Sequence, residues 1–295
     1  MSKKIKEIVI ISGKGGTGKT TVSSSFAYLS KGNAVLVDAD VDGSNLNIIA
    51  DGESVKSEQF YAGHQAKIDP VLCTSCSICE NSCHYKAITH NDQGVFTVSP
   101  ALCEGCKLCV MLCPSGAIDW NERLVGEIQQ LDTRFGPLIS SHLYPPGENS
   151  GKLVTEVRKW GRELAIKMDK ELIIVDGPPG IGCPTIAAMT SSDALVFVVE
   201  ASVSSLHDMK RIRKVAETFS IPSYVCINKS DINSEVTEEI ISYIHESNMN
   251  FLGTIVYDEE IGRALGQRKS VSEDSYGGKA REELLSIFNT LIQAI

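Results

Sequence analysis

The sequence predicts an α/β protein with a doubly wound, mostly parallel sheet, into which a smaller α+β module is inserted. Short runs of apolar and β-branched residues alternate with helical patterns such as Leu206, Met209 and Ile212, which indicates a parallel sheet covered on both faces. Eight clustered cysteines predict the inserted module. The expected strands are residues 7–12, 34–38, 171–176, 194–200, 223–228 and 251–256.

The first strand leads into a glycine-rich loop. Residues 13–20 match the phosphate-binding pattern G-x-x-x-x-G-K-T, and a second lysine, Lys14, follows the first glycine. Glycines let backbone N–H groups point at phosphate oxygens, and the next helix adds its positive end. Lys19 would reach the β- and γ-phosphates, and Thr20 would hold Mg²⁺. The expected nucleotide-binding residues are Gly13, Gly15, Gly16, Thr17, Gly18, Lys19, Thr20 and Thr21.

Acidic residues follow the second and third strands. The motif D-A-D-V-D carries Asp38, Asp40 and Asp42, and Asp176 ends the third strand. Ligands of open α/β sheets lie beyond the carboxyl ends of the strands, so these carboxylates are expected near the phosphates. Asp176 suits the Mg²⁺ shell, and Asp40 or Asp38 suits the orientation of an attacking water. Asp42 is explained equally well as a helix cap.

The composition limits the kind of protein. The chain has 295 residues, 42% of them apolar, and a formal net charge of −9, which argues against a general nucleic-acid binder. No apolar stretch approaches the roughly 20 residues that span a bilayer. We therefore expect a cytoplasmic protein with no nucleic-acid partner and no stable membrane association. Disulfides are rare in that compartment, so clustered cysteines indicate metal binding.

The cysteine-rich stretch is an internal repeat. Residues 68–88 align without gaps on residues 98–118, and each half contains C-x2-C-x2-C-x3-C. This is the bacterial ferredoxin pattern, which binds two [4Fe–4S] clusters and sends the fourth cysteine of each run to the other cluster. The expected ligand sets are Cys73, Cys76, Cys79 and Cys113 for one cluster and Cys83, Cys103, Cys106 and Cys109 for the other.

Zinc is the alternative metal that these cysteines could bind. Zinc sites, however, use paired C-x2-C rather than three cysteines at successive x2 spacing. His84 departs from the ferredoxin pattern, since proline is usual there. Outside the module, Cys226 is expected to be buried, and Cys183 has a packing role or a redox role. The predicted domains are residues 1–62 and 120–295 for the α/β domain and 63–119 for the ferredoxin-like module.

The last predicted element is a helix at residues 279–295. Its apolar residues fall on one stripe that could contact either a membrane or the sheet. Membrane-surface helices are usually rich in lysine and arginine on the polar face, and this one has only Lys279 and Arg281. We therefore expect the stripe to pack in the core. Its residues are Leu284, Leu285, Phe288, Leu291 and Ile292.

Three motifs together, K-G-G-T-G-K-T, D-A-D-V-D and D-G-P-P-G, resemble those of the MinD/ParA/Mrp class of deviant-Walker P-loop ATPases, which includes the nitrogenase iron protein. The resemblance covers the chain outside the insertion. It implies ATP and Mg²⁺ as ligands, an ATP-dependent homodimer or a heterodimer with a paralogue, and a Lys14 that reaches the partner's ATP. It also implies that Asn228 contacts adenine, although N-K-x-D at this strand end does not by itself exclude GTP.

The whole arrangement resembles MinD-superfamily ATPases that contain an inserted ferredoxin domain, a likeness that extends to the stretch at 145–154. The resemblance favours a slowly hydrolysing ATPase whose nucleotide state gates electron transfer to a protein acceptor. The alternatives are an assembly factor for iron–sulfur clusters or metallocofactors, and a MinD-like positioning ATPase with redox-sensing clusters. The expected partner, besides a second subunit, is a redox or metallocofactor protein.

Overall fold

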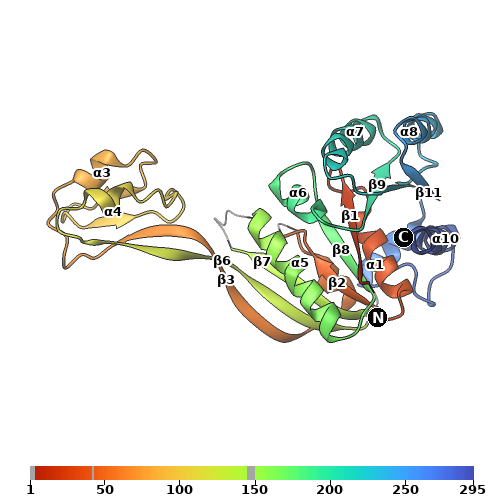
Figure 1. Ribbon diagram of the computed structural model, residues 1–295, viewed down its shortest axis with the longest axis horizontal. Helices are drawn as coiled ribbons and strands as arrows, with labels where there is room; N and C mark the ends of the chain where they lie inside the picture. Colours follow the sequence, from red (N-terminus) through yellow and green to blue (C-terminus); the bar gives the residue numbers. More distant parts are fainter. Residues whose placement is uncertain (1–3, 42, 145–149) are drawn as a thin grey trace. The chain divides into compact units, whose positions relative to one another are not determined.

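The computed structural model describes residues 4–41, 43–144 and 150–295 (Figure 1). The described residues form two units. One comprises the chain up to Glu58, Ile128–His142 and Ser150–Ile295, and the other comprises Gln59–Glu127 with Leu143 and Tyr144. All of residues 63–119, the predicted insertion, lie in the second unit. The start of the 145–154 stretch, up to residue 149, lies outside the described residues.

A nine-stranded sheet has the order β11-β10-β9-β1-β8-β2-β7-β6-β3. The six predicted strands are its first six members, and each neighbouring pair among them is parallel, which confirms the predicted parallel sheet. In spatial order these strands are β11 (Asn250–Ile255), β10 (Ser223–Asn228), β9 (Ala194–Glu200), β1 (Lys6–Ser12), β8 (Leu172–Pro179) and β2 (Ala34–Asp38).

Three strands at the other side of the sheet were not predicted. They are β7 (Gly136–Leu143), β6 (Ile118–Thr133) and β3 (Glu53–Ile68). β7 pairs with β2 in parallel, through Leu36 with Leu138 and Val37 with Ile139. The first seven residues of β3 are exposed, so this strand lacks the apolar run by which the buried strands are recognised.

Helices cover both faces of the sheet (Figure 1). On one face, Phe26 of α1 and Phe288 of α10 contact each other, with ring centroids 5.2 Å apart. On the other face, Gly161 of α5 lies so close to β2 that an added Cβ would be 2.4 Å from Val37 Cγ2. The helices of this unit are α1 (Lys19–Leu29), α2 (Leu46–Ala50), α5 (Ser150–Lys167), α6 (Cys183–Met189), α7 (Val203–Glu217), α8 (Ser234–Glu246), α9 (Glu259–Gly266) and α10 (Lys279–Ala294).

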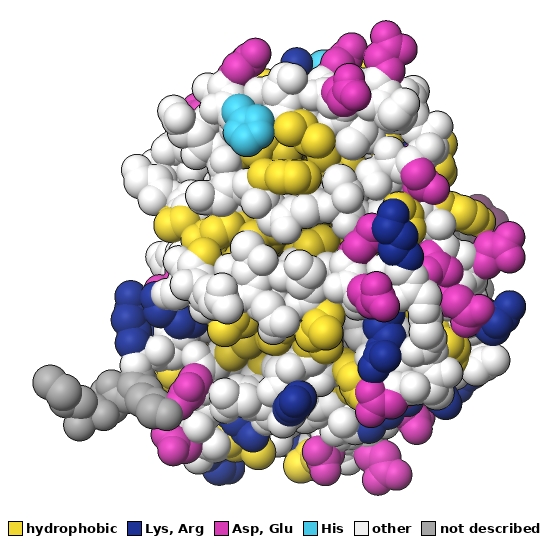
Figure 2. Space-filling view, turned by 90° about the vertical axis from the view of Figure 1, so that its right-hand side faces the viewer, with side chains coloured by type: hydrophobic (Ala, Val, Ile, Leu, Met, Phe, Trp, Pro, Cys, Tyr) yellow, Lys and Arg dark blue, Asp and Glu magenta, His cyan; other side chains and the backbone are white. Residues whose placement is uncertain are grey.

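The predicted C-terminal helix is α10, and its stripe is buried in part. Leu284, Phe288 and Leu291 are buried in the core, as predicted, whereas Leu285 and Ile292 are 45% and 40% exposed. Figure 2 shows apolar side chains in separate patches between acidic and basic ones, without a continuous basic area on this face. Among the described residues, no helix combines the length and apolarity that a membrane span requires.

A buried ion cluster anchors α5 to the start of β1. Glu7 is 2% exposed, and its carboxylate contacts Arg158 at 2.6 Å and Arg162 at 3.0 Å. Arg158 also donates to the carbonyl oxygens of Ala187 and Thr190, both at 2.7 Å. The guanidinium therefore joins β1, α5 and the end of α6.

We expect Glu7→Ala to lower the free energy of unfolding by about 3 kcal/mol, because it leaves the Arg158 guanidinium buried without its carboxylate. Urea unfolding followed by circular dichroism measures the change. Glu156→Ala is the matched control, since it removes an exposed pair with Lys159 on the same helix and such pairs contribute little. Equal stability losses in the two variants would contradict the assignment.

The second unit preserves the sequence repeat in its backbone. Its elements are α3 (Ile78–Ser82), β4 (Ile88–His90), β5 (Phe96–Val98) and α4 (Leu108–Leu112). The two halves exchange equivalent hydrogen bonds: Asp69 N donates to Ala117 O at 2.8 Å, and Ser99 N donates to Ala87 O at 2.7 Å. Its small core contains Ala66, Ile68, Ile88, Phe96 and Ile118, against which six of the eight clustered cysteines pack.

Candidate functional site

The glycine-rich loop connects β1 to the N-terminus of α1. Gly16 and Gly18 have φ values of 81° and 95°, which side chains other than glycine rarely adopt. Gly18 caps α1 without a side-chain hydrogen bond, and the first turn of the helix has no acidic residue. Backbone N–H groups at this helix end therefore remain available to an anion.

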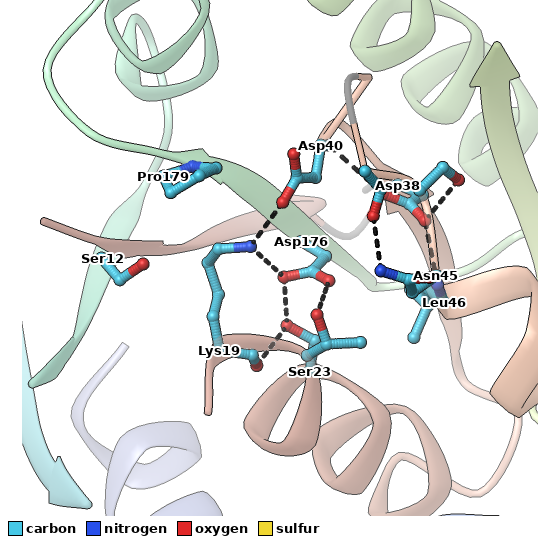
Figure 3. Close-up of polar contacts among 12 residues, drawn as sticks. Ser12, Lys19, Ser23, Asp38, Asp40, Asn45, Leu46, Asp176 and Pro179 are labelled. Atoms are coloured by element: carbon cyan, nitrogen blue, oxygen red, sulfur yellow. Dashed lines mark hydrogen bonds and ion pairs between the residues drawn. The ribbon is translucent and has the colours of Figure 1, made fainter. Parts of the chain in front are cut away.

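Lys19 lies among the acidic side chains that follow β2 and β8 (Figure 3). Its ammonium is 3.1 Å from Asp40 Oδ2 and 3.4 Å from Asp176 Oδ1. Burial lowers the pKa of Lys19, but Asp176 and Asp40 more than offset this, and the pKa is raised overall. Lys19 is therefore a fixed cation at the start of α1.

Asp176 is almost fully buried and connects β8 to α1. Thr20 Oγ1 donates to Asp176 Oδ2 at 2.9 Å, and Ser23 Oγ donates to Oδ1 at 2.9 Å. Thr20 and Asp176, which the sequence predicts as the Mg²⁺ residues, are thus adjacent. A hydroxyl and a carboxylate are the oxygen donors that Mg²⁺ prefers. The serine was not predicted, although it follows Lys19 by one helical turn.

The two aspartates after β2 have different surroundings. Asp38 is fully buried and accepts hydrogen bonds from Ser44 Oγ at 2.7 Å, Leu46 N at 3.0 Å and Asp40 N at 3.2 Å. Burial, followed by the charge of Asp176, raises the pKa of Asp38 to about 7. Asp38 fixes the loop to α2, whereas Asp40 lines the pocket beside Lys19. Of the two candidates for orienting water, Asp40 has the better position. Asp42 lies outside the described residues.

Lys14 contacts a pair of serines at the start of α7. Its ammonium donates to Ser204 Oγ at 3.0 Å and to Ser202 Oγ at 3.2 Å. Neither hydroxyl carries a charge, so moving Lys14 away from these two serines breaks hydrogen bonds but no ion pair with them. Next to it, a Cβ at Gly13 would lie 2.3 Å from Asp208 Cβ, so α7 packs directly on the loop. The two serines and Asp208 were not predicted as part of the site.

Asn228 supports the loop at the end of β10. Its side-chain amide donates to Thr17 O at 2.8 Å, and Lys229 N donates to its Oδ1 at 3.0 Å. It also lines the pocket, so the adenine contact implied by the resemblance stays a prediction. Asp231, the last residue of N-K-x-D, accepts from Tyr257 N at 2.6 Å and does not line that pocket.

We expect Gly18→Ala to weaken nucleotide binding by at least about tenfold. The φ of 95° costs a non-glycine residue roughly 1–2 kcal/mol, and the new Cβ would lie 2.2 Å from Asn228 Nδ2. Titration with a fluorescent ATP analogue measures the affinity. Gly266→Ala is the control, because a Cβ there has no neighbour within 4 Å and Gly266 does not line the pocket. Wild-type affinity in Gly18→Ala would mean that this close approach has no role in binding.

The pocket beside the loop has an apolar and acidic wall that the sequence did not reveal. Residues of the loop line it together with Asp40, Asn228, Ser12 and Pro179. It is also lined by residues that follow β11 and by residues of α9: Val256, Tyr257, Asp258, Glu259, Ile261, Gly262 and Leu265. A pocket that combines a phosphate-binding loop with apolar side chains has the features of a nucleotide site.

The eight clustered cysteines line two cavities of the second unit. Cavity 1 is lined by Cys73, Cys76, Cys79 and Cys113, and cavity 2 by Cys83, Cys103, Cys106 and Cys109. The structure thus brings together the same two sets that the spacing predicts, with the fourth cysteine of each run crossing to the other set. None of the ten cysteines, all of which lie in the described ranges, forms a disulfide bond.

No group of three or more His, Cys, Asp or Glu side chains in the described ranges is arranged to hold a metal ion. The iron–sulfur clusters therefore stay a prediction. Outside the module, Cys226 is fully buried, as predicted, and burial raises the pKa of its thiol to about 12. Cys183 is exposed at the first residue of α6.

Comparisons with known proteins agree with this geometry. Residues 8–271 match the family model described as the CobQ/CobB/MinD/ParA nucleotide binding domain. Among curated proteins, the uncharacterized protein MJ0578 of Methanocaldococcus jannaschii is 35% identical over 232 residues, which cover 78% of this chain and 80% of that protein. The ATP-binding protein MJ0823 of the same organism is 31% identical over 46% of this chain and 52% of its own.

Among solved structures, two archaeal proteins share the fold. The cell division ATPase MinD of Pyrococcus furiosus has a TM-score of 0.59 at 17% identity, covering all of both chains. The septum site-determining protein MinD of Pyrococcus horikoshii, solved with Mg-ADP, has a TM-score of 0.60 at 16% identity, covering 98% of this chain and 97% of that one.

Proposed function

The chain belongs to the CobQ/CobB/MinD/ParA nucleotide-binding family, and on that premise we propose that it is an ATP-hydrolysing dimer with two [4Fe–4S] clusters per subunit. ATP-driven closure of the dimer would control electron transfer from the clusters to a protein acceptor. The observation that carries this proposal is the division of eight cysteines into two crossed sets of four, in a chain whose other unit has a nucleotide pocket.

The nucleotide half of the proposal rests on the charges around the loop. Lys19 and the N-terminus of α1 would bind the phosphates. Thr20 and Asp176 would hold Mg²⁺, and Asp40 would orient the attacking water. The relative named as ATP-binding and the MinD solved with Mg-ADP support ATP as the nucleotide. Asp231 supports it as well, because its carboxylate is bonded to the backbone rather than turned to the pocket.

The cluster half rests on the fit of the cysteines to a polynuclear group. Four-cysteine Zn²⁺ sites use paired C-x2-C, whereas each run here places three cysteines at successive x2 spacing. Each cavity is lined by three cysteines of one run and the fourth cysteine of the other. Four thiolates around a cavity match the ligand set of a [4Fe–4S] cluster, which accepts and releases one electron. The protein's part is to hold each cluster with one cysteine from the other half of the repeat.

Lys14 would connect ATP hydrolysis to closure of the dimer. Among the described residues its ammonium is held by the neutral hydroxyls of Ser202 and Ser204, so a more negative site would attract it away. In a closed dimer that site would be the phosphates of the partner's ATP. A cation delivered only on closure stabilises transition-state charge and couples hydrolysis to dimerisation.

A positioning ATPase of the MinD kind is the second candidate, because the similarity to MinD structures covers nearly the whole chain. In that case the clusters would sense redox state. An assembly factor for clusters or metallocofactors is the third. Eight-cysteine chelation does not favour it, since a delivered cluster must leave its ligands.

The test is anaerobic purification followed by EPR-monitored redox titration with and without Mg-ATP. We expect about eight irons per chain, as two [4Fe–4S] clusters require, and midpoint potentials that shift with ATP in the wild type but not in Lys14→Ala. Unchanged potentials alongside intact ATP hydrolysis would reject gated electron transfer and favour the positioning role. Iron-free protein that still hydrolyses ATP would reject the clusters themselves.

A further inference from the structure

The repeat of the second unit allows a comparison of the two crossing cysteines in one chain. Cys83 and Cys113 occupy equivalent positions, and each Sγ accepts a hydrogen bond from a backbone N–H at 3.3 Å, that of Ala87 or Ala117. The two exposed cysteines of this unit, Cys76 and Cys106, also occupy equivalent positions. Backbone hydrogen bonding and solvent exposure are therefore matched between the two cavities at these positions.

One hydrogen bond breaks this equivalence. Ser115 Oγ lies 3.6 Å from Cys113 Sγ. A thiolate that binds iron has no proton, so the hydroxyl must be the donor. The equivalent residue in the other half is Tyr85, which is 43% exposed and contacts the ring of His84. Among the contacts of the described residues, Tyr85 donates none to Cys83.

Charges near the cavities do not offset this difference. The residues that line cavity 1 include no Asp, Glu, Lys or Arg. Cavity 2 is lined by Glu104 and Lys107, which have opposite signs. The ammonium of Lys107 also lies 4.7 Å from the ring centroid of Trp120, where the aromatic face attracts it. The Asp, Glu, Lys and Arg side chains that line the cavities thus contribute a net charge of about zero in both.

We propose that the Ser115 hydroxyl makes cavity 1 the site of higher reduction potential. This inference rests on the proposed function, since it concerns clusters held by the two cysteine sets. A hydrogen bond to a ligand sulfur stabilises the added negative charge of the reduced state and raises the potential. Reduction would add one electron to the cluster held in cavity 1. Dithionite supplies this electron in the test below, and the Ser115 hydroxyl keeps its proton. Ser115 is a positioning and tuning residue rather than a catalytic one.

The experiment is an EPR-monitored redox titration of the whole anaerobic protein at pH 8, with dithionite as reductant. Ser115→Ala should lower the higher of the two midpoint potentials and leave the lower one unchanged. Ser115→Thr, which keeps a hydroxyl, should restore it. Ser75→Ala is the matched control, because Ser75 also lies within a cysteine run but donates to Gly94 O at 2.9 Å. The reciprocal variant Tyr85→Ser should raise the lower potential.

A second readout does not depend on the potentials. Pulsed EPR of the reduced protein in H₂O and D₂O should detect two exchangeable protons near Cys113 Sγ, from the Ala117 N–H and the Ser115 hydroxyl. The hydroxyl coupling should be lost in Ser115→Ala and kept in Ser115→Thr, while the amide coupling remains in both. If both clusters form but Ser115→Ala changes neither the potentials nor the hydroxyl coupling, the inference is wrong and the proposed function stands. If the purified protein contains no iron, both are rejected together.

Discussion

Lys14→Ala is expected to lower the rate of ATP hydrolysis by on the order of 10³-fold while nucleotide affinity changes little. A cation supplied in trans stabilises charge that develops only in the transition state, and comparable arginine fingers contribute 10³- to 10⁵-fold. Affinity is retained because the binding cation is Lys19, which Asp40 and Asp176 hold within the subunit. Steady-state hydrolysis and titration with a fluorescent ATP analogue separate the two effects.

Mixing two inactive variants tests whether Lys14 acts in trans. A subunit with Lys14→Ala still binds ATP, and a subunit with Lys19→Ala still offers its Lys14. We expect the mixture to hydrolyse ATP faster than either variant alone, because one site of the mixed dimer then has both lysines. Activity that stays at the sum of the two variants would place Lys14 in its own subunit's site. Ser202→Ala serves as the control for the serine contact and should not reduce hydrolysis.

The parallel part of the fold could be predicted because its strands are buried on both faces. Residues 194–199, for example, are apolar throughout, a pattern that favours a strand buried on both faces. β3 and β6 could not be predicted in this way. Their exposed and buried residues are mixed, so neither a continuous apolar run nor a strict alternation marks them. In the sheet β6 lies next to β7, which pairs with β2, and β3 lies next to β6.

Some residues of the candidate site could also be predicted from local patterns, and others could not. Lys19, Thr20 and Asp176 follow from local motifs at strand ends, and the structure brings them within hydrogen-bonding distance. The serines that hold Lys14 are 188 and 190 residues away from it along the chain, so no local pattern connects them. The role of Asp38 depends on Ser44 and the backbone of Leu46, and a motif does not reveal which of two neighbouring aspartates turns inward.

The crossed cysteine sets predict which pairs of cysteine substitutions remove one cluster and which remove both. Cys113→Ala should reduce the iron content from about eight to about four atoms per chain, because one of two [4Fe–4S] clusters loses a ligand. Adding Cys76→Ala should cause no further loss, since cavity 1 is lined by both cysteines. Adding Cys106→Ala instead should remove the remaining iron, because Cys106 lines cavity 2.

The iron contents of these two double variants distinguish crossed ligation from an arrangement in which each run binds its own cluster. In that arrangement the roles of the partners are reversed: Cys113→Ala with Cys106→Ala would retain about four irons, and Cys113→Ala with Cys76→Ala would retain none. Cys183→Ala is the control for cysteine loss as such, because Cys183 is exposed at the start of α6 and belongs to neither set. Wild-type iron content in every variant would show that these thiols are not ligands. The crossed outcome would instead mean that neither half of the repeat can hold its cluster without the other, which explains physically why the module occurs as a pair.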